Sequence, residues 1–252
     1  MRNNDYFKEL WKRNFSILIP AVIILVLIGT QKPTYVIFAL LFLIISYAFS
    51  FKNVNRNIEN YFRSESPDKL VNYYIKTINT KTQDRDVMLF FSNSIVYCYY
   101  GDFDKAMELL KDIKWNEKVP FLQAFEYLAK AQISYLRDKN FNEGLRLSLI
   151  AQQLSLTSKK YPGINTSNEG FDTYIQVGKI LLDHNDQYIL NELEAKFKNT
   201  KFFIQKVFIA WCLSIVYMMN QMNDHAQEMN EYCKKAVPYC KPMFNEQIHS
   251  DV

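Results

Sequence analysis

Near its start the chain reads FSILIPAVIILVLIGT over residues 15–30 and TYVIFALLFLIISYAFSF over residues 34–51. Neither segment contains Asp, Glu, Lys, Arg or His, and only Gln31, Lys32 and Pro33 separate them. At a rise of about 1.5 Å per residue, each helix approaches the roughly 30 Å hydrocarbon thickness of a bilayer once its flanks are counted. So short a connection predicts an antiparallel transmembrane hairpin, with all later residues on the side of Met1.

Basic residues flank this hairpin and predict its orientation. Four precede the first segment, three follow the second, and one lies in the turn: Arg2, Lys8, Lys12 and Arg13, then Lys52, Arg56 and Arg63, and in the turn Lys32. Positively charged flanks stay on the cytoplasmic side of a membrane. We therefore expect a multi-pass protein of the cell membrane with two helices and both termini in the cytoplasm.

The remaining sequence predicts one soluble domain with little net charge. The chain has 252 residues, so about 200 follow the hairpin, which is enough for a sizeable core. The chain has 30 Lys and Arg and 26 Asp and Glu. Five of the basic and two of the acidic residues lie in residues 1–51, so the sequence after residue 51 is nearly neutral. Nucleic-acid binding requires a strongly basic face, so nucleic acid is not expected as a partner.

Two helices are expected between the hairpin and the main domain. Val54, Ile58 and Phe62 recur at helical spacing, with Tyr61 beside them. The sequence Ser66-Pro67-Asp68 is typical of a helix start, with an N-cap serine and a proline in the first turn. From residue 84 onward the sequence shows no strand pattern, and helical periods alternate with short turns.

A characteristic turn between two helices occurs early in this region. An apolar helical stretch containing Tyr97 meets Gly101-Asp102-Phe103, and a second helix with Ala106 follows. Gly101 permits the turn, and Asp102 can cap the second helix. The frame of Tyr, Gly-Asp-aromatic and Ala resembles the tetratricopeptide repeat (TPR), a pair of antiparallel helices. The resemblance implies that the Tyr, the aromatic residue and the small Ala pack the two helices together.

Further copies of this frame follow along the chain. The second has Tyr135, Phe141 and Gly144, and the fourth has Tyr217 and Ala226. A third and weaker copy is predicted at Leu182, Asp186 and Asn191, after a loop rich in Pro, Gly, Ser and Asn. The expected fold is all-α, with a membrane anchor at 1–51, juxtamembrane helices and a candidate cap at 52–83, an α-solenoid of TPR-like hairpins at 84–237, and a C-terminal tail at 238–252.

The resemblance also implies a binding groove. In a stack of such pairs, the first helix of each pair lines a concave face. Eight mostly apolar residues are placed there: Phe91, Ile95, Tyr99, Ile133, Arg137, Trp211, Ile215 and Met218. A groove rich in aromatic residues and Met suits an amphipathic helix or a hydrophobic peptide. The alternative is that flanking helices of the chain, such as residues 67–79, bury these side chains.

The sequence assembles no catalytic or cofactor motif. His184, His225 and His249 lie in a predicted turn, a helix start and the tail, and no HExxH, GxSxG, CxxC or Walker motif occurs. A zinc site that draws on Cys233 and Cys240 is an alternative without matching ligand spacing. The four cysteines otherwise fit reduced cytoplasmic thiols. We expect no cofactor, no metal and no enzymatic activity.

Two functions fit these expectations. The first is a membrane-anchored cytoplasmic scaffold or adaptor that binds a protein or peptide in its apolar groove, with the lipid bilayer as a second partner. The alternative is a peptide sensor or immunity-type protein that captures a hydrophobic peptide at the membrane. Anchoring raises the effective concentration near membrane partners, so weak affinity suffices for either. Both functions require that the apolar groove is open.

Overall fold

A computed structural model describes residues 54–78, 85–157 and 164–245, with the backbone alone for 164–168. The chain divides into two compact units, Met1–Asn57 and Ile58–Val252. The predicted transmembrane hairpin, at residues 15–30 and 34–51, lies outside the described residues. Within the described ranges, no helix is both long enough and apolar enough to cross a membrane.

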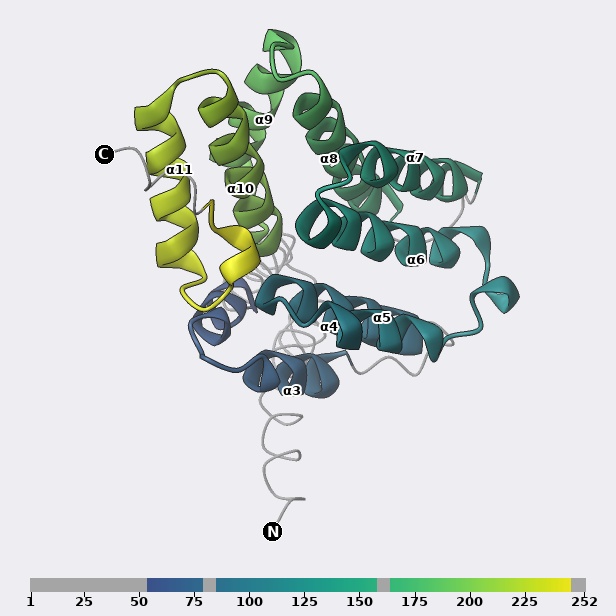
Figure 1. Ribbon diagram of the computed structural model, residues 1–252. Helices are drawn as coiled ribbons and strands as arrows, with labels where there is room; N and C mark the ends of the chain where they lie inside the picture. Colours follow the sequence, from purple (N-terminus) through teal and green to yellow (C-terminus); the bar gives the residue numbers. More distant parts are fainter. Residues whose placement is uncertain (1–53, 79–84, 158–163, 246–252) are drawn as a thin grey trace, which may run out of the picture. The chain divides into compact units, whose positions relative to one another are not determined.

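The described part of the second unit is all-helical, as the sequence predicts, and these residues contain no strand (Figure 1). After a helix over residues 54–62, the elements are α3 (Asp68–Thr77), α4 (Arg85–Tyr100), α5 (Phe103–Lys111), the 3₁₀ helix η1 (Trp115–Glu117), α6 (Pro120–Ile133), the π-helical turn η2 (Ser134–Asp138), α7 (Phe141–Thr157), α8 (Ile164–Leu182), α9 (Gln187–Asn199), α10 (Phe203–Met219), α11 (Asn223–Ala236) and the 3₁₀ helix η3 (Lys241–Met243).

Successive helices pack as hairpins, and the hairpins pack on one another. The pairs are α4 with α5, α6 with α7, α8 with α9, and α10 with α11. The first helices of the pairs also meet, because α4 contacts α6, α6 contacts α8, and α8 contacts α10. This arrangement is compatible with a helical-repeat fold.

The turns inside three of these pairs share one backbone feature. Gly101, Lys139 and Gln221 have φ angles of 84°, 50° and 60°. Each lies four residues after the tyrosine of the predicted frame. A left-handed residue directly after a helix is a common way to end it, and glycine adopts that conformation most easily. The first, second and fourth copies of the sequence frame therefore coincide with the same turn in the structure.

The third pair follows the same plan, one residue away from the predicted position. Asp186 Oδ1 accepts a hydrogen bond from the Ile189 amide at 3.1 Å, as Asp102 Oδ1 does from Lys105 at 3.3 Å. Counting from this cap, buried Leu190 occupies the position of Ala106. The predicted residue, Asn191, is exposed. The prediction was therefore wrong by one residue in this copy.

Tyr135 joins three helices at the centre of the unit. Its ring lies against Gly144 of α7, where an added Cβ would come within 2.3 Å of Tyr135 Cε1. Its hydroxyl donates to the Tyr174 carbonyl of α8 at 3.0 Å. A Cβ on Gly178, also in α8, would lie 2.3 Å from the Tyr135 hydroxyl oxygen. The absence of a side chain at both glycines is therefore what lets Tyr135 reach from η2 to α8.

The first and last hairpins are in direct contact. The Tyr99 hydroxyl donates to the Ile204 carbonyl of α10 at 2.8 Å. Phe62 packs beside this bond, with its ring centroid 5.5 Å from that of Tyr99 and 5.8 Å from that of Phe203. Phe62 is fully buried. The helix at residues 54–62 is therefore held by both ends of the series of hairpins.

Part of the predicted C-terminal tail belongs to the core. The last helix ends at Ala236, and Cys240 and Met243 after it are fully buried. The short helix η3 contacts α4, α10 and η2. Pro242 lies so close to the Gly101 turn that a Cβ there would be 3.2 Å from Pro242 Cγ. Residues 237–244 thus pack against α4, α10 and η2 rather than extending into solvent.

Candidate functional site

Half of the residues predicted to line the groove are inside the folded unit. Ile95, Tyr99, Ile133 and Trp211 are each at most 4 % exposed. For Tyr99 the physical reason is the contact between the first and last hairpins, which places Ile204 of α10 and Phe62 of the helix at residues 54–62 against it. For these four residues the structure agrees with the alternative expectation, in which other parts of the chain bury the groove. The helix that packs on Tyr99 is the one at residues 54–62, rather than residues 67–79.

The other four predicted residues lie at or near the surface. Phe91 is half-buried and packs on Phe125, with ring centroids 4.9 Å apart. Arg137 is exposed and pairs with Asp138, its Nε 2.7 Å from the carboxylate. Ile215 and Met218 are half-buried on α10. The structure brings together the α10 residues and leaves Phe91 in a separate contact.

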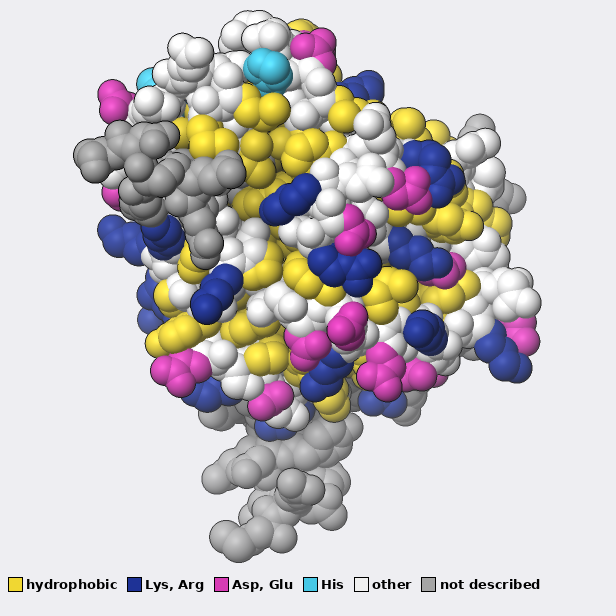
Figure 2. All heavy atoms as spheres, viewed as in Figure 1, with side chains coloured by type: hydrophobic (Ala, Val, Ile, Leu, Met, Phe, Trp, Pro, Cys, Tyr) yellow, Lys and Arg dark blue, Asp and Glu magenta, His cyan; other side chains and the backbone are white. Residues whose placement is uncertain are grey.

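One strip of α10 is buried at Trp211 and half-buried further along, at Ile215 and Met218. Trp211, Ile215 and Met218 follow one another at helical spacing on α10, and Lys139 Nζ lies 5.2 Å from the centroid of the Trp211 ring. We call these four residues the inner-face strip. Figure 2 shows hydrophobic side chains gathered at the surface over α10. Lys139 is not among the residues predicted to line the groove. The only feature of the sequence that points to it is its position in the α6–α7 turn, two residues after the predicted Arg137.

The chemistry of the strip combines adaptable apolar groups with a cation. Met219 and Met222, at the turn that follows α10, are 42 % and 38 % exposed and extend the apolar surface. Partial burial lowers the pKa of the Lys139 ammonium group, and the Trp211 ring offers it a cation–π contact. Methionine side chains are flexible and polarizable, so they adapt to different apolar partners.

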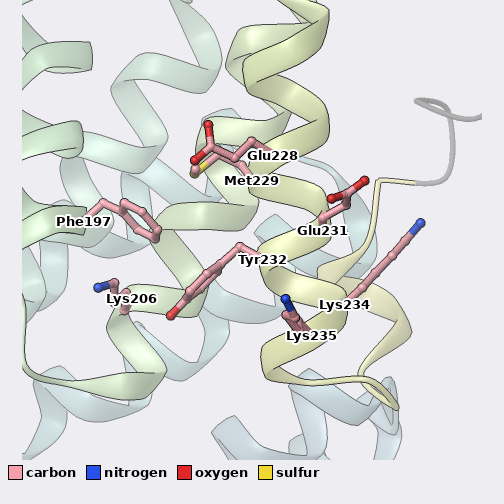
Figure 3. Close-up of a pocket in the computed structure, with 8 residues that line it drawn as sticks. All are labelled: Phe197, Lys206, Glu228, Met229, Glu231, Tyr232, Lys234 and Lys235. Carbon is pink, nitrogen blue, oxygen red and sulfur yellow. The ribbon is translucent and has the colours of Figure 1, made fainter.

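A hollow lies between α9 and α11, and Lys206 of α10 also lines it (Figure 3). We call it the α9–α11 groove. It has a volume of about 680 Å³. Phe197 and Tyr232 meet edge to face with ring centroids 5.1 Å apart, and Lys206 Nζ lies 4.9 Å from the Phe197 centroid. Glu228 and Lys235 complete its two ends.

The sequence gives little sign of this groove. Glu228, Tyr232 and Lys235 share one face of α11 at helical spacing, which is the only signal it has in the sequence. Such a face is usually covered, and nothing in the pattern shows that α9 leaves it open. Burial raises the pKa of Tyr232 to about 12, so its hydroxyl is neutral at physiological pH and can donate a hydrogen bond.

The cysteines and His184, which the sequence offered as candidates for chemistry, have structural roles in the fold. The four cysteines are free and buried, and burial raises the pKa of each thiol. The His184 turn is held by Asn220, whose Nδ2 donates to the His184 carbonyl at 2.8 Å. Within the described part of the chain, no group of three or more His, Cys, Asp or Glu side chains could hold a metal ion.

Comparisons with known proteins assign no family. No protein-family model, no curated protein and no solved structure matches the chain.

Proposed function

We propose that this protein is a membrane-anchored cytoplasmic interaction module, a scaffold or adaptor whose TPR-like unit binds a segment of a protein partner on the inner-face strip. The observation that carries the proposal is the strip itself: Ile215 and Met218 of α10 are half-buried, and the exposed Lys139 holds its ammonium group over the ring of the buried Trp211. Both the repeat class and the membrane anchor are parts of this proposal.

The repeated turn supports the TPR-like class. A left-handed residue recurs at Gly101, Lys139 and Gln221, and a small residue follows it at Ala106, Gly144 and Ala226. In the second pair this small residue is what admits the tyrosine ring, as the 2.3 Å approach at Gly144 indicates. Helical repeats of this kind usually serve as surfaces for binding other proteins.

The strip favours a partner segment of defined chemistry. Its apolar length along α10 matches one face of an amphipathic helix, which presents anchors at i, i+4 and i+7. Lys139 favours a carboxylate beside that apolar face. We therefore expect a short amphipathic segment with at least one acidic residue, from a protein at the same membrane.

Photo-crosslinking from the full chain in its own membrane tests this proposal. A photoreactive phenylalanine analogue replaces Met219 beside the strip, and a matched control replaces Leu149 of α7, which is similarly exposed at 45 %. We expect a discrete adduct from position 219 that is absent from position 149. An adduct with a folded protein supports a scaffold, whereas an adduct with a short free peptide supports the peptide sensor instead.

A binding measurement then connects the adduct to the strip. The crosslinked segment is synthesised and titrated into the full chain in detergent. We expect Lys139→Glu to weaken binding about tenfold, in line with loss of a charge-assisted contact, and Lys111→Glu, on the exposed end of α5, to leave it unchanged. Equal adducts at both positions, or equal affinity of both variants, would reject the inner-face strip as the binding site.

A further inference from the structure

The α9–α11 groove has a basic end and an acidic end. Lys206 and Lys235 lie at one end, and Glu228 lies two helical turns from Lys235 at the other (Figure 3). Tyr232 lies between Lys206 and Lys235, with its ring against Phe197. The groove therefore offers two ammonium groups and a phenol hydroxyl at one end, which is the donor set that a phosphate group accepts.

The positive charges at this end are not neutralised by the fold. Of the ion pairs between described residues, none involves Lys206 or Lys235. Lys130 and Lys196, by contrast, each lie 2.6 Å from a carboxylate oxygen. Lys206 instead rests over the Phe197 ring, a contact that leaves its ammonium group able to bind an anion.

The basic end lies next to the point where the chain enters the folded unit. Phe62 packs on Phe203 with ring centroids 5.8 Å apart, and Lys206 follows Phe203 by three residues, one helical turn further along α10. Lys201 and Phe202, just before α10, are both exposed. Exposed aromatic and basic side chains together are typical of surfaces at the lipid headgroup level.

The chain itself limits how far the start of the folded unit can be from the proposed anchor. Six residues, 52–57, lie between residue 51, where the predicted second membrane helix ends, and Ile58, where the folded unit begins. Even fully extended, the seven steps from residue 51 to Ile58 span at most roughly 25 Å. Ile58 can therefore lie no further than this from the end of the predicted anchor.

We propose that the basic end of the α9–α11 groove binds the phosphate of an anionic lipid headgroup, with Lys206, Lys235 and the Tyr232 hydroxyl as donors. This inference rests on the membrane anchor of the proposed function, but not on the inner-face strip. It gives the folded unit a fixed orientation on the bilayer, because a second contact beside the tether prevents free rotation about the chain at Ile58.

Residue-specific acetylation of the full chain in lipid nanodiscs tests the proposal. Discs of phosphatidylcholine alone are compared with discs that contain phosphatidylglycerol, and the acetylation rate of each lysine is measured by mass spectrometry. An anionic surface strengthens the binding of a nearby lysine roughly fivefold, so we expect acetylation of Lys206 and Lys235 to slow about fivefold in the anionic discs.

Lys179 is the internal control. It is exposed and lies one turn before Asp183, in the α8–α9 connection that Asn220 binds, at the opposite end of α10 from Phe203. We expect its rate to change little. We also expect Lys206→Glu to abolish most of the protection of Lys235, and Lys179→Glu to preserve it.

Several outcomes would overturn the proposal. Equal slowing at Lys179 would show a general surface effect, and no slowing at Lys206 would show that no lipid binds there. Equal protection by inorganic phosphate in phosphatidylcholine discs would assign the site to a free anion. A chain that elutes apart from the discs would reject the anchor as well, whereas a chain that stays in the discs with unprotected lysines would reject the lipid site alone.

Discussion

The contact of Tyr135 with two glycines makes a quantitative prediction. In Gly178→Ala, the new Cβ would lie 2.3 Å from Tyr135 Oη and 2.9 Å from Leu145 Cβ, where ordinary contacts begin at 3.4 Å. The hydroxyl must therefore move by about 1 Å, which breaks its 3.0 Å hydrogen bond to Tyr174.

The magnitude follows from three contributions. Overpacking of a core costs about 1–3 kcal/mol, the lost hydrogen bond costs about 1 kcal/mol, and the better helix propensity of alanine returns about 1 kcal/mol. The net loss is about 2 kcal/mol, or roughly 4–8 °C in Tm for a unit of this size. The assay is thermal unfolding of the full chain in detergent, followed by far-ultraviolet circular dichroism.

A second background isolates the cause. Tyr135→Phe removes the oxygen that Gly178→Ala would strike, so in that background the alanine should cost less, and what remains is the 2.9 Å approach to Leu145 Cβ. Gly144→Ala is the matched control, because its Cβ would strike the ring carbons Cε1 and Cδ1, which phenylalanine retains. Equal costs of Gly178→Ala in both backgrounds, or relief of Gly144→Ala by Tyr135→Phe, would refute this account of the packing.

Three further predictions concern the same unit. Phe62→Ala removes the ring that packs on Tyr99 and Phe203, so it should lower the free energy of unfolding by about 3–5 kcal/mol in urea titrations; a loss below about 1 kcal/mol would contradict the packing. The four buried cysteines should resist a thiol reagent in the native chain and react together on unfolding, whereas rapid reaction of any one would place it at the surface. Burial raises the pKa of Tyr232 to about 12, against about 10 in an unfolded chain. The neutral hydroxyl therefore contributes its full stability below pH 10, and this contribution is lost as the pH rises toward 12. The Tm of Tyr232→Phe should fall less than that of the unmodified chain between pH 10 and 12, and an equal fall in both chains would contradict the raised pKa.

The repeat frame could be predicted where its residue types are distinctive. Tyr97 and Tyr217 are each followed by a left-handed turn and a small residue, and the structure has both turns at the expected positions. The third copy carries no tyrosine, and its two adjacent leucines, Leu181 and Leu182, offer two registers. Only the cap formed by Asp186 decides between them, and a cap is seen in the structure but not in apolar spacing.

The state of the inner face could not be predicted from the sequence. An apolar residue that faces a ligand and one that faces its own chain have the same spacing, so Trp211 and Ile215 looked alike. Trp211 is buried, with Phe208 stacked on its ring and Lys139 from the α6–α7 turn 5.2 Å from it, whereas Ile215 one turn further is half-buried. The buried Cys240 and Met243 were missed for a related reason, since Pro238 and Pro242 correctly indicate the end of a helix but not that the following residues return to the core.

The contact between the first and last hairpins has a consequence for synthesis of the protein. The Tyr99 hydroxyl and its acceptor at Ile204 are 105 residues apart in the chain. At about 5–20 residues per second, a ribosome needs roughly 5–20 s to make that interval. For that time Phe62 and Tyr99 are synthesised but uncovered, so the nascent chain presents a large aromatic surface that a chaperone can bind until α10 emerges.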